Sequence, residues 1–296
     1  MTWSKAASPA ATRPRRRSAV HVAGLSKSYG TSCAVRDLDL DVEHGEIFAI
    51  LGPNGAGKST TIEILEGHRQ RDAGQVSVLG EDPGAAGRSW RAKIGIVLQE
   101  ASDFGMLKVS ETVHMFAQCY GKARGPEEVL ELVGLGSVRD SKVRALSGGQ
   151  RRRLDVALGV INMPELVFMD EPTTGFDPEA RRRFWDIIRL LAADGTTVLL
   201  TMHYLEEAAT LADRVAVIAA GSLVALDSPA KLTRYVSSAA TVRWMEGDEV
   251  QVERTDYPTE LIRRRSANGK ELGRLTVSRP TLEDAYLQLI GQADEC

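Results

Sequence analysis

One short segment combines the residue types that bind phosphate. Residues 51–61 read LGPNGAGKSTT and match the spacing GxxxxGK[ST]. In this pattern the glycines let successive amides point at phosphate oxygens, the lysine reaches the outer phosphates and the hydroxyl ligates Mg²⁺. We therefore predict a nucleotide-phosphate site in residues 52–60, the phosphate loop, whose members are Gly52, Pro53, Asn54, Gly55, Ala56, Gly57, Lys58, Ser59 and Thr60.

A pair of acidic residues follows an apolar run further along the chain. Residues 166–172 read LVFMDEP, so Asp170 and Glu171 stand at the carboxyl end of an expected buried strand. Open α/β sheets bind their ligands at this edge. We expect Asp170 to hold Mg²⁺, directly or through water, and Glu171 to orient or deprotonate an attacking water. The structural alternative is two acids that cap a strand before Pro172.

A second loop also has the features of an anion site. In ALSGGQRRRLDVALGVI, which begins at Ala145, a Ser-Gly-Gly turn leads into a helix. Exposed amides and the Ser147 hydroxyl at a helix start favour an anion. A phosphate loop alone is compatible with a kinase, a GTPase, a helicase or a transporter motor, so the other motifs must decide among them.

The apolar pattern predicts the elements that position these motifs. A strand at 46–51 precedes the phosphate loop and a helix follows it. From Val20 to about Leu226, apolar runs alternate with helical stretches, which predicts a mostly parallel sheet flanked by helices. Two amphipathic stretches between Gln99 and about Leu146 predict a helical insertion. After Pro229, short alternating runs, a charged turn RRRSANGKE and a final helix that packs within the chain predict a small α+β appendage.

Composition disfavours several functional classes. The chain has 296 residues, 43% of them hydrophobic, and a net charge of -3, so we expect a substantial core and no nucleic-acid partner. No stretch approaches the roughly 20 apolar residues of a membrane helix, so we expect no membrane crossing. Three scattered cysteines fit neither a disulfide framework nor a zinc site. The arginine-rich start is expected to be a disordered tail, with a lipid contact as the alternative.

The three motifs together resemble an ATP-binding cassette, the nucleotide-binding subunit of ABC transporters. LSGGQ, residues 146–150 and here the signature loop, lies between GPNGAGKST and LVFMDEP, and the resemblance covers about residues 20–226. It implies an α/β fold with a P-loop NTPase core, an antiparallel β subdomain and a helical subdomain. We expect a disordered basic tail at 1–18, an ATPase domain at 19–228 with its helical subdomain at about 100–160, and a C-terminal α+β extension at 229–296.

The resemblance implies roles for four residues outside the loops. Tyr29 matches the aromatic residue that stacks on adenine, and His203 matches the switch histidine that contacts the γ-phosphate. Gln99 matches the glutamine that touches Mg²⁺ and the attacking water and links to the membrane partner. Asp177 matches the loop that crosses the dimer interface, although many cassettes carry leucine where this chain has Phe176. That departure leaves the aspartate intact and puts only the local packing in question.

The resemblance also implies how two chains cooperate. The signature loop of one subunit closes over the ATP that the other subunit holds, so the chain should dimerise with itself or with a paralogous cassette. ATP and Mg²⁺ are the implied cofactors, and the signature loop adds the ATP-binding residues Ser147, Gly148, Gly149 and Gln150. The expected catalytic residues are Glu171, His203 and Gln99. The expected metal ligands are Ser59, Gln99 and Asp170.

Two further segments indicate the branch of the family. TTGFDP and the closing RPTLEDAYLQLIG resemble the branch that powers drug-resistance and related bacterial export systems. We therefore predict an ATPase that energises export of a drug- or antibiotic-like compound through a separate polytopic permease, peripherally bound at the cytoplasmic face of the cell membrane. An importer ATPase and a soluble cassette ATPase of translation or DNA repair are the alternatives.

Overall fold

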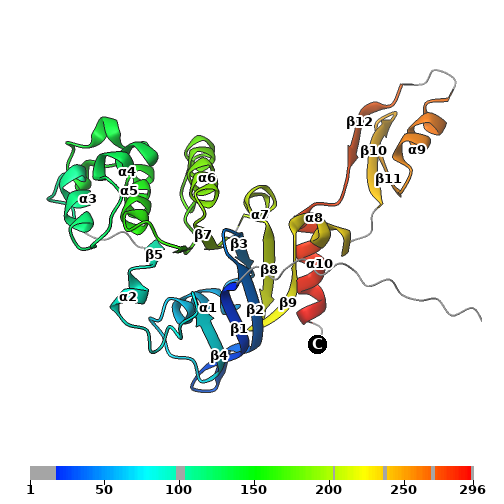
Figure 1. Cartoon of the computed structure of the whole chain (residues 1–296). Coiled ribbons are helices and arrows are strands. Elements are labelled where there is room, and N and C mark those ends of the chain that lie inside the picture. Colours follow the sequence, from blue (N-terminus) through cyan, green and yellow to red (C-terminus); the bar gives the residue numbers. More distant parts are fainter. Residues whose placement is uncertain (1–17, 98–103, 203, 236–238, 268–270, 295–296) are drawn as a thin grey trace, which may run out of the picture.

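The computed structural model describes residues 18–97, 104–202, 204–235, 239–267 and 271–294 (Figure 1). The expected basic tail, apart from Ser18, lies outside these residues. Gln99 and His203 lie outside them too.

The central sheet is parallel except at one edge. Its strands, in spatial order, are β5 (Ile94–Val97), β6 (Leu166–Met169), β7 (Thr197–Thr201), β3 (Ile47–Leu51), β8 (Arg214–Ala219) and β9 (Ser222–Asp227). Only β9 runs antiparallel to its neighbour. Every residue of β3, β6 and β7 is buried, as expected where both faces of a parallel sheet are covered. The mostly parallel sheet predicted from the sequence is therefore confirmed, and its strand ends meet at one edge.

An antiparallel sheet packs against one side of the central sheet. It contains β2 (Ser32–Glu43), β1 (Ser18–Tyr29) and β4 (Ala73–Val78), in that order. Burial alternates along β2, so one face is apolar, and Val22 and Leu40 from this face share an apolar cluster with Phe48 and Ile50 of β3. Helices α1 (Lys58–Leu65) and α2 (Arg88–Arg91) lie beside it.

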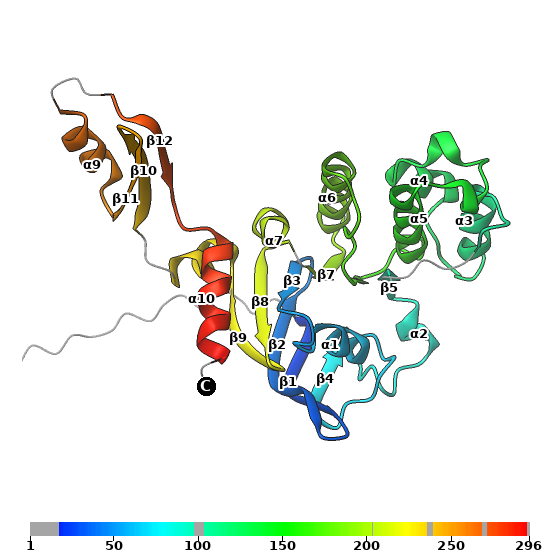
Figure 2. The ribbon, with the colours of Figure 1, turned by 180° about the vertical axis from the view of Figure 1, so that it is seen from behind.

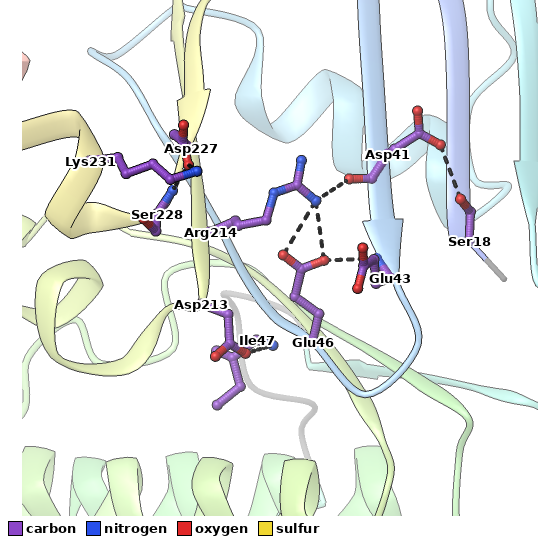
Figure 3. A network of polar contacts seen from close by, with 10 residues as sticks. All are labelled: Ser18, Asp41, Glu43, Glu46, Ile47, Asp213, Arg214, Asp227, Ser228 and Lys231. Atoms are coloured by element: carbon purple, nitrogen blue, oxygen red, sulfur yellow. Dashed lines mark hydrogen bonds and ion pairs between the residues drawn. The ribbon is translucent and has the colours of Figure 1, made fainter. Parts of the chain in front are cut away.

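Polar contacts join the two sheets at the end of β3 that is farthest from the phosphate loop (Figure 3). Arg214 Nη1 donates to the Asp41 carbonyl at 3.1 Å and lies 3.5 Å from the Glu46 carboxylate. The Ile47 amide donates to Asp213 Oδ2 at 2.9 Å. These contacts fix the start of β3 against β2 and β8. The other end of β3 is thereby held in register for the loop that follows it.

Helices form a lobe beside strand β5 (Figure 1). The lobe contains α3 (Val109–Ala117), α4 (Pro126–Leu132), the 3₁₀ turns η1 (Gly136–Val138) and η2 (Val143–Ala145), and α5 (Gly148–Val160). The two amphipathic helices predicted between Gln99 and Leu146 are thus confirmed. A Cβ on Gly95 would lie 2.0 Å from the Gly159 carbonyl oxygen, so α5 rests directly on β5. Helices α6 (Pro178–Ala193) and α7 (Leu205–Leu211) follow β6 and β7.

The C-terminal region is a second, smaller α+β unit. After α8 (Pro229–Leu232) and η3 (Thr233–Tyr235), it contains β10 (Ala240–Glu246), β11 (Glu249–Thr255), α9 (Pro258–Arg265) and β12 (Gly273–Ser278), with strand order β11-β10-β12. The predicted turn in the charged segment RRRSANGKE is wrong for the first three residues of that segment, because residues 263–265 form the end of helix α9. The helix forms because Leu261 packs on Val242 and Trp244, a contact that the charged sequence conceals.

The final helix, α10 (Leu282–Asp294), returns to the region of the central sheet rather than to the small sheet (Figures 1 and 2). Leu282, Tyr286 and Leu289 join the large apolar cluster that also contains Val215 of β8 and Leu211 of α7. The helix therefore packs within the chain, as predicted. Among the described helices, none is both long enough and apolar enough to pass through a bilayer.

Candidate functional site

The phosphate loop turns sharply between β3 and α1 and is pressed between two strands. A Cβ on Gly57 would lie 2.2 Å from the Ala34 carbonyl oxygen, and one on Gly52 would lie 2.2 Å from the Ile218 carbonyl oxygen. Gly57 also has φ +96°, which side chains rarely allow. Gly55 has φ +79°, but its Cβ would meet nothing within 4 Å. Two glycines are thus required by close packing and a third by conformation alone.

Lys58 folds over the carbonyls of its own loop. Its Nζ donates to the Gly52 carbonyl at 2.9 Å and to the Pro53 carbonyl at 3.1 Å, and the residue is only 5% exposed. Burial lowers the pKa of the Lys58 ammonium, whereas the charges of Glu171 and Asp170 act in the opposite direction. Nearby negative charge therefore favours the charged lysine, and the phosphates of a nucleotide would act in the same sense.

A cavity of about 510 Å³ lies over this loop. Its lining combines loop residues with one residue from each of two distant segments: Ala34, Asn54, Gly55, Gly57, Lys58, Ser59, Thr60 and Glu171. Because α1 begins at Lys58, its first amides have no acceptor within the helix. Amides, an ammonium and hydroxyls together fit a nucleoside triphosphate, and the oxygens of Ser59 and Asp170 are of the kind that Mg²⁺ prefers.

The two carboxylates that follow β6 are held by a neighbouring strand. Glu171 has φ +45°, an uncommon conformation for a residue with a side chain. Its amide donates to Thr201 Oγ1 at 2.9 Å, and the Thr201 hydroxyl donates to Asp170 Oδ1. Thr201 was not among the residues predicted from the sequence. Its position at the end of the strand beside β6 was the available signal.

The signature loop is fixed by a reciprocal cap at the start of α5. The Gln150 amide donates to Ser147 Oγ at 3.3 Å, and the Ser147 amide donates to Gln150 Oε1 at 3.0 Å. The hydroxyl of Ser147 accepts in this cap, so its own proton can be donated elsewhere. A cavity of about 310 Å³ is lined by this loop and by Asp177, the residue that caps α6.

The segment before α6 accommodates its unusual aromatic residue. Phe176 is buried, and its ring packs edge-on against Phe184 with centroids 5.7 Å apart. Asp177 Oδ1 accepts a hydrogen bond from the Ala180 amide at 2.8 Å. The doubt raised by the replacement of leucine at Phe176 is thereby answered. Phenylalanine fills the local core and the aspartate is kept as the helix cap.

The structure brings the predicted residues together in two groups, and a third cavity, of about 360 Å³, is lined by both Glu171 and Gly148 of the signature loop. Lys58, Ser59 and Glu171 share the cavity over the phosphate loop, whereas Ser147 and Asp177 share the cavity at the signature loop. Tyr29 lies at the end of β1 and is 42% exposed, with the Arg69 guanidinium 5.2 Å from its ring centroid. Gln99 and His203 fall outside the described residues.

A further cavity beside β5 is lined by a buried acid and a half-buried acid that were not predicted from the sequence. It measures about 470 Å³, and its polar lining includes Glu66, His68 and Asp155. Burial, followed by the charge of Asp170, raises the pKa of Glu66 to about 8. Burial likewise raises the pKa of Asp155 to about 6, although Arg152 opposes the shift. His68 Nδ1 lies 3.2 Å from Glu66 Oε2.

Comparison with known proteins places this site in a family. A family model described as "ABC transporter" matches residues 35–174. The chain is 44% identical over 232 residues to the daunorubicin/doxorubicin resistance ATP-binding protein DrrA of Streptomyces peucetius, a match that covers 77% of this chain and 70% of that protein. The chain belongs to the ABC transporter family. It is also 37% identical over 299 residues to the Nod factor export ATP-binding protein I of Rhizobium sp. (strain N33), covering 94% of this ABC transporter chain and 98% of that protein.

A solved structure of the family has the same fold. The dimeric structure of a post-hydrolysis state of the ATP-binding cassette MJ0796, bound to ADP and Pi, superposes with a TM-score of 0.64 at 24% identity. The match covers 71% of this ABC transporter chain and 98% of that chain. The predicted P-loop NTPase core with an antiparallel β subdomain is therefore confirmed. The roles of the individual site residues stay predictions.

Proposed function

We propose that the chain is the ATP-binding and ATP-hydrolysing subunit that energises an export system. The observation that carries this proposal is its similarity, over 94% of its length, to a protein named for Nod factor export, together with its similarity to one named for daunorubicin and doxorubicin resistance. The first match extends over almost all of that protein, so it involves the C-terminal unit as well as the ATPase core. A drug- or antibiotic-like compound is the cargo that the daunorubicin/doxorubicin resistance name favours.

The geometry supports hydrolysis at the end of β3. ATP with Mg²⁺ would supply the phosphoanhydride bond and neutralise the phosphate charge. The amides of the phosphate loop and the Lys58 ammonium bind the phosphates, and Ser59 and Asp170 offer oxygens to the metal. Glu171 lines the same cavity, so its carboxylate is placed to orient a water for attack. Phosphoryl transfer needs mainly positioning and charge neutralisation, which this donor set supplies.

The separation of the two loops supports a dimer. In one chain, the phosphate loop and the signature loop line different cavities. Two chains facing each other would let each signature loop, capped through Ser147 and Gln150, reach the ATP held by the other. Binding of ATP across that interface favours the closed pair, and hydrolysis removes the contacts that hold it closed. The partner in this pair is a second copy or a paralogous cassette.

Transport itself requires another chain. We assign that role to a polytopic permease, with this subunit bound peripherally at the cytoplasmic face of the membrane. Gln99, which follows β5, is the residue that the family resemblance connects to such a partner. The ATPase cycle would then supply the conformational work for export.

Drug uptake by inverted membrane vesicles tests the proposal. The chain is co-expressed with a polytopic permease of a drug-export system, and ATP-dependent doxorubicin accumulation is measured for wild type and for Lys58→Ala. Accumulation only with wild type is the expected result. Equal accumulation with both chains would contradict the proposal. Co-purification of a substrate-binding protein would indicate an importer, and co-purification of ribosomes or DNA would indicate a soluble cassette ATPase.

A further inference from the structure

Arg152 is a buried cation inside the helix that begins at the signature loop. It is 9% exposed and is the only buried arginine among the described residues. Its Nη2 donates to the Asp170 carbonyl at 2.8 Å, and its Nε donates to the Pro172 carbonyl at 3.1 Å. These two carbonyls belong to the residues immediately before and after Glu171. One guanidinium therefore donates hydrogen bonds to the backbone on both sides of Glu171.

Glu171 has a strained backbone conformation that contacts with its neighbours must stabilise. The positive φ of Glu171 is a conformation that a residue with a side chain keeps only when its surroundings fix it. The Thr201 hydroxyl, at the end of β7, accepts a hydrogen bond from the Glu171 amide. Arg152, on α5, donates hydrogen bonds to the carbonyls of the two adjoining residues. The planar fork of arginine can make both contacts at once, whereas an ammonium offers a single point of charge.

Neighbouring carboxylates also favour the charged form of Arg152 at this buried position. Burial lowers the pKa of the Arg152 guanidinium, and the carboxylates of Asp155, Asp170 and Glu171 oppose that shift and favour the charged form. A buried cation is retained without penalty only where such partners and acceptors compensate it. The contacts with the backbone carbonyls are therefore charge-assisted and stronger than ordinary hydrogen bonds.

We propose that Arg152 is a positioning residue that holds Glu171 in its left-handed conformation and ties it to the signature helix. Ser147 caps α5 and Arg152 lies in the second turn of the same helix. A movement of the signature loop therefore shifts the Arg152 guanidinium and its hydrogen bonds on both sides of Glu171. Because the signature loop contacts the other subunit's ATP in the proposed dimer, the hydrogen bonds of Arg152 connect the two hydrolysis sites. This inference rests on the proposed ATPase function.

The test compares three variants of the full chain. Arg152→Met removes both charge-assisted donors, and Arg152→Lys restores one charge. Arg71→Met is the matched control, since Arg71 lines neither the phosphate-loop cavity nor the signature-loop cavity and its Nε also donates to a backbone carbonyl, that of Gly74, at 3.0 Å. ATP affinity is measured with a fluorescent ATP analogue, turnover by phosphate release at high protein concentration, and folding by thermal unfolding.

The expected pattern separates positioning from binding. Arg152→Met should lower kcat by about 10- to 100-fold, the scale of one released backbone strain, while ATP affinity changes less than about threefold. Arg152→Lys should recover part of the loss, and Arg71→Met should keep turnover within about threefold of wild type. A kcat of Arg152→Met equal to wild type, or an equal loss in Arg71→Met, would overturn the inference. Failure of wild type to bind or hydrolyse ATP would instead refute the proposed function.

A double-mutant cycle tests the link to the signature loop. Ser147→Ala and Arg152→Met are measured singly and together in the same turnover assay. If α5 transmits the effect, the combined loss should be smaller than the product of the single losses, because both changes break one connection. Losses that multiply would refute the link. Where Arg152→Met unfolds below the assay temperature, Arg152→Lys takes its place in the cycle.

Discussion

Replacing single glycines of the phosphate loop by alanine should separate steric packing from conformational strain. Gly55 and Gly57 both have positive φ, so alanine at either position costs about 1–2 kcal/mol for a left-handed backbone. At Gly57 the new Cβ would also lie 2.2 Å from the Ala34 carbonyl oxygen, more than 1 Å inside ordinary contact at 3.4 Å. Overpacking of this kind adds about 1–3 kcal/mol. Gly57→Ala should therefore lose about 2–5 kcal/mol of unfolding free energy and Gly55→Ala only about 1–2 kcal/mol.

Urea unfolding of the nucleotide-free chain measures this difference, with wild type and both variants at one pH and temperature. A shift in the denaturation midpoint without a change in slope is required for the comparison, because the slope reports the surface exposed on unfolding. The midpoint of Gly57→Ala should be clearly lower than that of Gly55→Ala. Equal midpoints for the two variants would refute the close packing of the loop against β2.

Three other substitutions test separate parts of the site. Lys58→Ala should weaken ATP binding by about 10- to 100-fold, the value of one charge-assisted contact, as measured by analogue displacement. Thr201→Val leaves the Glu171 amide and the Asp170 carboxylate without their hydroxyl and should lower turnover, with a loss of unfolding free energy of about 1–3 kcal/mol in calorimetry. Because the pKa of Glu66 is raised from 4.5 to about 8, folding favours its neutral form. Its stabilising effect is complete below pH 4.5 and is lost as the pH rises to 8, by at most about 5 kcal/mol. Glu66→Gln should therefore match wild type in thermal unfolding near pH 4.5 and exceed it near pH 9.

The parts of the fold that the sequence predicts are those that depend on local patterns. The spacing from Gly52 to Ser59 requires a loop between a strand and a helix, and β3 and α1 lie where that spacing puts them. The apolar run at 166–169 predicts a buried strand, so the place of Asp170 at its end follows directly. The helix after Ser147 is equally local, because its cap is made by Gln150 three residues later.

The remaining features depend on contacts between distant segments. No local pattern indicates that Arg152 reaches the carbonyls on either side of Glu171, or that Thr201 supports the same residue from β7. The order of the six central strands is likewise set by packing and crossover connections. Helix α9 was missed because Leu261 is its only buried residue, and its other positions carry too much charge to reveal an apolar face.

ATP turnover by the Glu171→Gln chain tests the proposed hydrolysis most directly. The substitution keeps the size of the side chain and the hydrogen bonds that Arg152 makes with the adjoining backbone carbonyls. It removes the carboxylate that lines the phosphate-loop cavity. Turnover should fall by about 100-fold or more, while ATP affinity is retained and ATP-dependent dimers accumulate in analytical ultracentrifugation. Wild-type turnover in this variant would contradict the assignment of Glu171 and, with it, the proposed mechanism.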